Sequence, residues 1–264
     1  MVGPQWPAFF WHRGFQGRMT TNVLDFKAKR ITSDSRWSLP INHYLCFIDD
    51  SGFDKISNRP TAAMICAGDA ILIDAWKQWF GSSDPDIDLP STIRYDRNGK
   101  MAGVCISIID KPSFTVDCKA GTYHPLEDLA SFCGSGGAAA LSCYATNGCS
   151  TRCIESASLV DAQTGGSVKF VEIETQLNNL GPATTTYEDL KESLLKRGKI
   201  MNLLTGEITR VQPIDEGTLR EALSAGTVSL TAPTGMVPRE WTEEEKQAAR
   251  AARRRIIERE QATA

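Results

Sequence analysis

The order of apolar runs along residues 20–173 constrains most strongly what this chain can fold into. Short runs of β character alternate with segments of helical spacing, clearest in ILIDAWKQWF, where apolar residues recur every three or four positions. We expect strands at 20–33 (two strands and a turn), 44–48, 61–66, 103–109, 113–118 and 165–173, and helices at 71–80, 136–144 and 150–160, the last capped by Ser150 or Thr151. This order favours an α+β fold in which helices lie outside stacked sheets.

The character of the chain changes after residue 180. A helix capped by Thr186 is expected to end at Gly198, a second helix is expected at 217–225, and a linker rich in Pro and Gly covers 233–238. We therefore divide the chain into a segment 1–19, a core 20–180 and a C-terminal extension with helices at 181–264.

A last helix is predicted to begin at Thr242, which forms a capping box with Glu245, and to reach about Glu260. Its apolar stripe is thin and consists chiefly of Ala249, Ala252 and Ile256. We expect such a helix to pack on a neighbouring subunit or to project as a charged docking arm. A solvated, partly frayed tail is the alternative.

Composition excludes several classes of partner. The net charge of −3 indicates neither nucleic acid nor a membrane surface, and no apolar run approaches the roughly 20 residues that span a bilayer. Most of the eight cysteines stand in apolar segments, which favours a reduced, cytoplasmic protein. Only Cys149 and Cys153 approach the spacing of metal ligands, and the sequence has no second pair that would complete a site with them. We therefore expect neither a metal nor a cofactor.

The first eighteen residues differ from the rest of the chain. They are rich in Trp and Phe, and their apolar part, PAFFW, is too short for a signal peptide. They are either a pro-region whose removal frees Thr20 or residues upstream of a start at Met19. We favour the start at Met19.

Five short stretches carry the chemistry of the sequence. They are Thr20-Thr21 after Met19, Asp34-Ser35-Arg36, Ala67-Gly68-Asp69, the turn Gly134-Ser135-Gly136-Gly137, and Asp161-Ala162-Gln163-Thr164-Gly165-Gly166. Each is weak alone. In this order the set resembles the proteasome β-subunit superfamily of N-terminal-nucleophile (Ntn) hydrolases, which includes related bacterial ring proteases. The resemblance covers about residues 20–175, and it implies a four-layer αββα sandwich of two antiparallel sheets flanked by helices.

The chemistry of a threonine nucleophile can also be argued from the residues. A threonine hydroxyl needs a base, and if Thr20 is the first residue its own α-amine supplies one, with an unperturbed pKa of about 7.7–8.0. A cation such as Lys55 would lower the pKa values of that amine and hydroxyl, and Asp34 would hold Lys55 charged. The backbone N–H of Gly68 is expected to stabilise the oxyanion.

The resemblance implies further roles. Ser135, Asp161 and Thr164 are expected to complete a hydrogen-bonded set around the threonine amine. Thr21, Trp37 and Cys66 are expected to contact the substrate, the last two at the residue before the scissile bond. The segment between Asp34 and Lys55 is longer than in the family.

Each residue also has an ordinary structural interpretation. Thr20 and Thr21 are common residues in strands, Asp34 is common in turns, and Lys55 resembles many surface lysines. Trp37 is more often found in a core than in a pocket. The glycine-rich turn at 134–137 can simply open a helix or bind an anion.

The combined reading is a threonine endopeptidase that cleaves polypeptides inside a homo-oligomeric ring, with two stacked rings of six or seven subunits by resemblance. An ATP-dependent unfoldase is a possible partner. An Ntn amidohydrolase acting on a small amide is an alternative within the same mechanism. A non-catalytic assembly subunit, in which residues 1–18 stay attached, is an alternative from another class.

Overall fold

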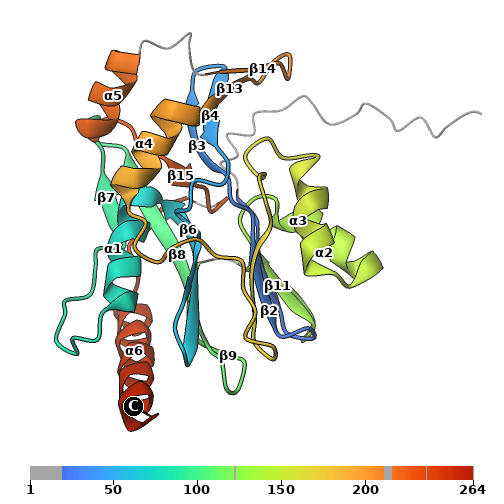
Figure 1. The fold of residues 1–264 in the computed structure, drawn as a ribbon, viewed down its shortest axis with the longest axis vertical. Helices are drawn as coiled ribbons and strands as arrows, with labels where there is room; N and C mark the ends of the chain where they lie inside the picture. Colours follow the sequence, from blue (N-terminus) through green and yellow to red (C-terminus); the bar gives the residue numbers. More distant parts are fainter. Residues whose placement is uncertain (1–19, 122, 211–215, 236, 264) are drawn as a thin grey trace, which may run out of the picture.

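The computed structural model describes residues 20–121, 123–210, 216–235 and 237–263, so the segment 1–19 lies outside the described residues. Within these ranges the fold is mixed α+β, with six helices and two antiparallel sheets (Figure 1). The expected α+β class is confirmed. The expected strands and helices between residues 20 and 173 are found with shifts of a few residues at their ends.

The smaller sheet begins with the strand–turn–strand unit that the sequence predicts at 20–33. Asn22 stands opposite Ser33 across this hairpin, and the Asp25 side chain accepts from the Ala28 N–H in the turn at 2.9 Å. The five strands lie in the order β10 (Tyr123–Leu126), β11 (Ala130–Cys133), β1 (Asn22–Asp25), β2 (Arg30–Ser33) and β12 (Lys169–Glu172).

The larger sheet has ten strands. Eight follow one another in the order β14 (Ile208–Arg210), β13 (Lys199–Asn202), β4 (Tyr44–Ile48), β3 (Trp37–Ile41), β15 (Thr231–Ala232), β6 (Ala62–Asp69), β8 (Met101–Asp110) and β7 (Ile93–Tyr95). In addition, β5 (Ile56–Asn58) pairs with β6, and β9 (Thr115–Ala120) pairs with β8. Strand β6 is buried along its whole length, which explains the apolar run from Ala62 to Ala67.

Three apolar clusters hold the layers together. One lies between the two sheets and includes Leu24 and Ile31 from the smaller sheet and Ile65 from β6. A second packs the other face of the larger sheet, through Met64 and its neighbours, against α1 (Ala70–Gly81), α4 (Tyr187–Arg197), α5 (Glu216–Ser224) and α6 (Glu243–Thr263). The third packs the smaller sheet against α2 (Gly137–Asn147) and α3 (Ser150–Ser158), which lie on its outer face (Figure 1).

Helix ends follow local chemistry. Asp69 caps α1 by accepting from the N–H groups of Ile71 and Leu72. Thr186 caps α4, as the sequence predicts, and the cap is a reciprocal capping box with Asp189. The prediction of Ser150 or Thr151 as the cap of α3 is wrong, because both residues are already helical. Cys149 occupies the cap position and makes no side-chain hydrogen bond there.

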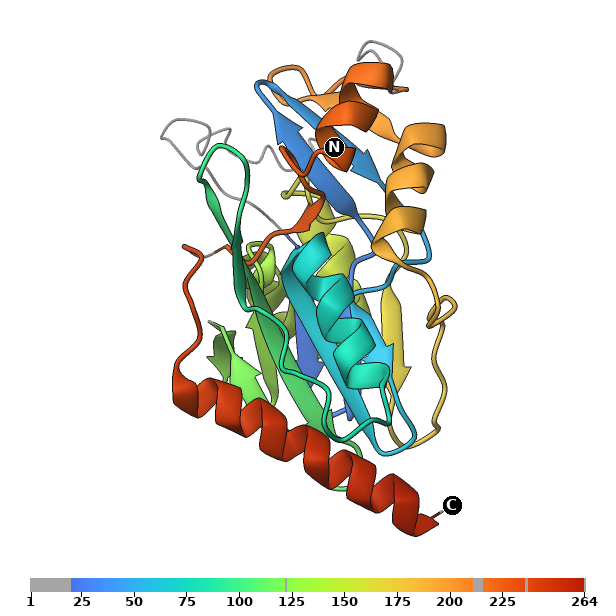
Figure 2. The same cartoon turned by 90° about the vertical axis from the view of Figure 1, so that its left-hand side faces the viewer.

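The segment after residue 180 contributes both strands and helices to the same body. Strands β13, β14 and β15 join the larger sheet, and Figure 2 shows α6 crossing the molecule beside β8 and β9. Ala249, Ala252 and Ile256 are buried in the core cluster, and the Arg253 side chain donates to the Trp79 carbonyl at 3.0 Å. The expectation that this helix packs on a neighbouring subunit, projects or frays is therefore wrong. Its thin stripe packs on its own chain, beside β8 and β9.

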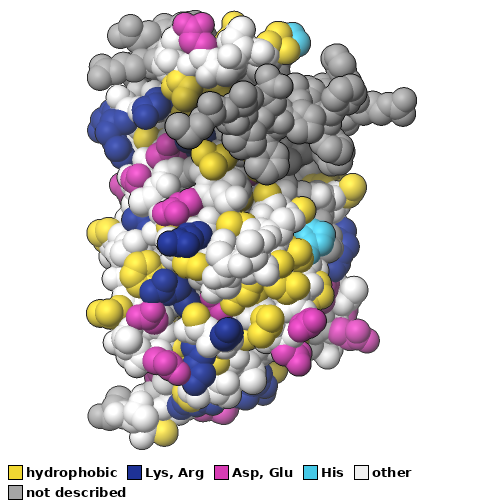
Figure 3. Space-filling view, turned by 90° about the vertical axis from the view of Figure 1, so that its right-hand side faces the viewer, with side chains coloured by type: hydrophobic (Ala, Val, Ile, Leu, Met, Phe, Trp, Pro, Cys, Tyr) yellow, Lys and Arg dark blue, Asp and Glu magenta, His cyan; other side chains and the backbone are white. Residues whose placement is uncertain are grey.

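The surface that carries α2 and α3 shows basic and acidic side chains intermingled (Figure 3). Across the described residues, every helix is too short or too polar to span a lipid bilayer.

Candidate active site

Three predicted residues meet because of where their strands begin and end. Thr20 and Thr21 directly precede β1, Asp34 directly follows β2, and Lys55 directly precedes β5. The β1–β2 hairpin brings the Asp34 N–H to the Thr21 carbonyl at 3.2 Å. Pairing of β5 with β6 then carries Lys55 to the same place, where its carbonyl accepts from the Cys66 N–H at 2.8 Å.

The side chains of Thr20, Asp34 and Lys55 form one buried hydrogen-bonded cluster. The Thr20 hydroxyl donates to Asp34 Oδ1 at 2.5 Å, and Lys55 Nζ donates to the same oxygen at 2.7 Å. Lys55 Nζ also donates to Thr20 Oγ1. All three residues are at most 1% exposed. A hydroxyl in direct contact with a buried ammonium group lies in a field that favours its anionic form.

Backbone donors hold the Asp34 carboxylate in place. The Thr21 N–H donates to Oδ1 at 3.0 Å, while the N–H groups of Arg36 and Gly165 donate to Oδ2 at 3.1 and 3.2 Å. The carboxylate is therefore fixed in position from both sides and keeps its orientation toward Lys55.

Burial dominates the electrostatics of Lys55. It lowers the pKa of the ammonium group from its ordinary value, and the Asp34 carboxylate opposes this shift through its charge and its hydrogen bond. The Trp37 ring lies 5.6 Å from Nζ and adds an aromatic face on another side. Such a lysine titrates more easily than a surface lysine, which suits a group near a proton transfer.

A second hydrogen-bonded set adjoins the first. The hydroxyls of Thr21 and Thr164 lie 2.8 Å apart, and Thr164 donates to Asp161 Oδ2. The Gln163 N–H donates to the other oxygen of Asp161 at 2.9 Å. Burial is the largest influence on Asp161 and raises the pKa of its carboxyl group, although these hydrogen bonds oppose the shift.

The glycine-rich turn fits tightly against the two threonines. Gly134 has φ +87°, and a Cβ there would lie 2.0 Å from the Thr20 carbonyl oxygen. A Cβ on Gly136 would lie 2.0 Å from the Thr21 hydroxyl. Among the described residues, the Ser135 hydroxyl is buried and has no hydrogen-bond partner.

The loop 161–166 is fastened to the strand end by Arg36, a contact that sequence reasoning missed. The guanidinium group binds both carboxylate oxygens of Asp49 at 2.8 and 2.9 Å and donates to the Ala162 carbonyl at 2.6 Å. A Cβ on Gly165 would lie 2.5 Å from this guanidinium, so a larger residue would displace it. The stretch Asp34-Ser35-Arg36 and the loop 161–166 are thus in direct contact.

Gly68, the predicted oxyanion donor, lies in β6 with φ +129°. A Cβ at this position would lie 2.3 Å from the Gly103 carbonyl oxygen. Its neighbours across the sheet are Val104 of β8 and Ala232 of β15. Strands therefore flank the predicted oxyanion position on both sides.

The two residues predicted to flank a substrate pocket lie in the core. Trp37 is 0% exposed and its indole donates to the Phe53 carbonyl at 2.6 Å, and Cys66 is 1% exposed. The Cys66 carbonyl accepts from the Asn22 side chain at 3.0 Å, which ties β6 to the start of β1. Both residues thus border the site from within the protein rather than from an open surface.

The position of Pro233 beside Thr20 was not predicted from the sequence. The Pro233 carbonyl accepts from the Thr20 N–H at 3.1 Å. Prolines and glycines at 233–238 are typical of a linker, and two residues of β15 are too few to show alternation. No sequence signal placed this segment beside Thr20.

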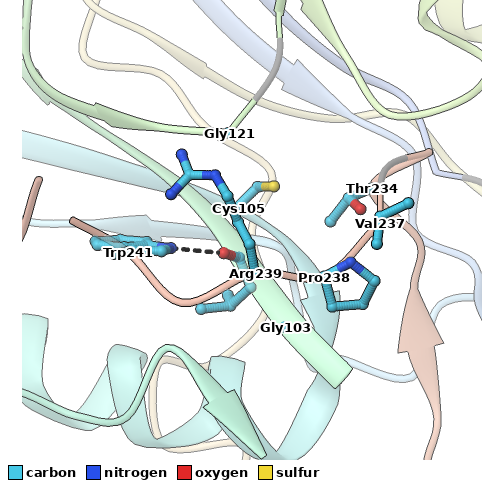
Figure 4. A pocket seen from close by; sticks show the side chains of 9 residues that line it. Gly103, Cys105, Gly121, Thr234, Val237, Pro238, Arg239 and Trp241 are labelled. Atoms are coloured by element: carbon cyan, nitrogen blue, oxygen red, sulfur yellow. Dashed lines mark hydrogen bonds between the residues drawn. The ribbon is translucent and has the colours of Figure 1, made fainter. Parts of the chain in front are cut away.

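A small cavity adjoins the segment that follows β15 (Figure 4). Its volume is about 20 Å³, enough for about one water molecule, so it offers no room for a substrate. It is lined by Gly103, Val104, Cys105, Gly121, Thr234, Val237, Pro238, Arg239 and Trp241. The Trp241 indole donates to the Val104 carbonyl at 3.0 Å and anchors the chain beyond it (Figure 4).

In the ranges that the structure describes, no three His, Cys, Asp or Glu side chains are grouped so as to hold a metal ion. Comparison of the chain with protein-family models found no match, and a search of curated proteins found none either.

Proposed function

We propose that this chain gives an N-terminal-threonine hydrolase of the proteasome type, an endopeptidase with Thr20 as its nucleophile. The observation that carries the proposal is the buried cluster in which one threonine hydroxyl contacts both a carboxylate and an ammonium group. A cluster of ionised groups in a fully buried position is costly to stability, so a chemical role is the better explanation for it.

The proposed mechanism uses the α-amine that appears when the bond before Thr20 is cut. That amine accepts the proton of Thr20 Oγ1 while the oxygen attacks the carbonyl carbon of a peptide bond. The amine then returns the proton to the leaving nitrogen, and an ester to Thr20 remains. Water, deprotonated by the same amine, hydrolyses the ester. Lys55 stabilises negative charge on Oγ1, and Asp34 holds Lys55 in place.

The unpaired Ser135 hydroxyl supports this scheme. The turn that carries it touches Thr20, since the Gly136 N–H donates to the Thr20 carbonyl at 3.4 Å. A free amine on Thr20 would be a partner for Ser135, and the Asp161–Thr164 pair lies on the adjoining threonine. The same turn and loop would thereby fix the amine in the orientation that proton transfer requires.

We propose further that the two sheets with their outer helices form the four-layer αββα sandwich of Ntn hydrolases. The apolar cluster between the sheets and the helices on both outer faces support this architecture. A homo-oligomeric ring that admits unfolded polypeptides, a cytoplasmic location and an ATP-dependent unfoldase as partner belong to the same proposal. The eight cysteines form no disulfide with one another, which is compatible with this location.

One observation favours the non-catalytic assembly subunit as a second candidate. In the intact chain the Thr20 nitrogen is an amide, it donates to the Pro233 carbonyl, and Thr20 is 0% exposed. A chain that is never cut before Thr20 would keep this arrangement and would have no base.

Substitution of the nucleophile tests the proposal. We expect Thr20→Ala to abolish hydrolysis of fluorogenic peptides, because no other side chain takes over the attack. Thr20→Ser should keep part of the activity, since the hydroxyl remains. Circular dichroism of both variants serves as the folding control. Full activity in Thr20→Ala would refute the assignment.

A further inference from the structure

Strand β15 occupies an unusual place in the larger sheet. It consists of Thr231 and Ala232 only, yet it lies between β3 and β6 and pairs with both in antiparallel fashion. Thr231 stands opposite Ser38 on one side and Asp69 on the other. Without β15, the edges of β3 and β6 would face each other across a gap one strand wide, each with unpaired N–H and C=O groups.

The residues of this segment reach the candidate site one after another. Ala232 pairs with Gly68, the predicted oxyanion donor. The buried carbonyl of Pro233 accepts from the Thr20 N–H at 3.1 Å. Gly235 lies against Ser135, since a Cβ on this glycine would be 3.4 Å from the Ser135 backbone. An extended backbone therefore runs from the sheet directly past the proposed nucleophile.

Contacts besides the strand pairing also hold the segment. The Leu230 side chain is buried in the core, and its carbonyl accepts from the Ala70 N–H at 3.0 Å. The Ser229 hydroxyl donates to Asp69 at 2.5 Å, and the Thr231 hydroxyl donates to the Ser38 carbonyl at 3.2 Å. The strand pairing and the Leu230 carbonyl use backbone groups that any extended polypeptide carries. The side chains of Ser229, Leu230 and Thr231 add contacts that are particular to this segment.

We infer that residues 229–235 are an internal occupant of the groove that receives the polypeptide substrate. The substrate is an extended, unfolded polypeptide that binds between β3 and β6 in place of β15, and the segment must leave before the substrate enters. The inference rests on the proposed function for its chemistry, but the groove itself is defined by the strand pairing. Strand addition of this kind depends mainly on the backbone, so the recognised class is unfolded chains of varied sequence.

A reversible cross-link tests this inference. Thr231 and Ser38 are directly opposite residues of antiparallel strands, a placement that suits a disulfide. We expect the oxidised double variant Ser38→Cys/Thr231→Cys to lose hydrolysis of unstructured fluorogenic peptides, and a reductant to restore it. The two single variants, treated with the same oxidant, are the controls. Equal activity of the oxidised and reduced double variants would overturn the inference.

Peptide binding in a Thr20→Ala background separates the groove from the chemistry. Fluorescence anisotropy of a labelled unstructured peptide should show binding to the reduced double variant and none to the oxidised one. If the peptide binds only after reduction of the disulfide, while the protein that carries Thr20 hydrolyses nothing, the result would support the groove and refute the proposed hydrolase activity. Hydrolysis that requires Thr20 and is equal with and without the cross-link would support the hydrolase. It would refute the proposal that residues 229–235 occupy the substrate groove.

A release variant covers the case in which the double variant does not fold. Leu230→Ala removes the main apolar anchor of the segment, so the groove should be open more often and the peptide should bind about 10- to 100-fold more tightly. Leu223→Ala, the same change in the same cluster but on α5, is the matched control. Unchanged peptide affinity in Leu230→Ala, or an equal gain in Leu223→Ala, would contradict the inference.

Discussion

At the scale of single residues, the Lys55 ammonium group is the most informative feature. Burial of a charge costs several kcal/mol, and an ion pair recovers only part of that cost. Asp34 is already held by backbone N–H groups, so it does not need Lys55 to be satisfied. The one group that gains chemically from Lys55 is the Thr20 hydroxyl beside it.

Removal of this charge should affect the reaction far more than an equivalent change elsewhere. We expect Lys55→Ala to lower kcat/KM by about 10²–10⁴, the usual contribution of a group that assists proton transfer. Lys55→Arg should restore little of the activity, because a planar guanidinium group differs in shape from the compact ammonium group of lysine. Lys111→Ala is the matched control, since Lys111 is also buried and donates to the Arg59 carbonyl. If the folded Lys55→Ala protein were as active as the control, Lys55 would have no role in the reaction.

The lowered pKa of Lys55 should appear in the pH profile of kcat/KM as a fall on the alkaline side. The active form has a neutral α-amine and a charged lysine, so activity rises with pH as the amine loses its proton, near or below about 8. It then falls as Lys55 loses its proton, and since burial lowers that pKa the fall occurs below about 10.4, the value for free lysine. Circular dichroism at each pH separates titration from unfolding. A profile that stays level up to the pH of unfolding would contradict the role of the charged lysine.

At the scale of elements, the sequence predicts those parts whose signals are local. Helix α1 shows its apolar period and α4 its Thr186 cap. The β1–β2 hairpin shows its turn, so the proximity of Thr20 and Asp34 follows from the sequence. Strand β15 depends on pairing with strands far away in the chain and has too few residues for a pattern. Strand β3 is absent from the expected strands, and it contains Pro40, a residue that is uncommon within strands. The position of α6 was missed because a thin stripe does not show which surface it covers.

Helix α6 should contribute to the stability of its own chain. We expect Ile256→Ala to lower the free energy of unfolding by about 2–5 kcal/mol, because the side chain is 2% exposed within the core cluster. Arg254→Ala, an exposed position on the same helix, should change it by less than about 0.5 kcal/mol. Urea denaturation followed by circular dichroism measures both. Equal small effects would mean that α6 does not pack on the chain as described.

At the scale of the whole molecule, burial of the thiols reports on the intact fold. Burial raises the pKa of the Cys46 thiol to about 11 and those of Cys66 and Cys118 to about 12. Fewer thiolates at about pH 8 mean slow alkylation, so iodoacetamide should label chiefly Cys143 and Cys149, which are partly exposed. Peptide mass spectrometry before and after denaturation gives the comparison. Rapid labelling of Cys46 in the native protein would contradict the described core.

Assembly is the second prediction at this scale. By resemblance we expect a closed homo-oligomer, two stacked rings of six or seven subunits, measurable by light scattering on the full chain. The full chain is required for this measurement, because removal of Trp241 and α6 would take away part of the core. A monomer at micromolar concentration would contradict the ring and favour the amidohydrolase of small amides.

The intact mass of the purified, active protein tests the central claim most directly, since the proposed base exists only when Thr20 is the first residue. The account predicts a chain that begins at Thr20 and hydrolyses peptides, and a Thr20→Ala protein that does not hydrolyse them. A protein that retains residues 1–19 in full and still hydrolyses peptides would contradict the mechanism.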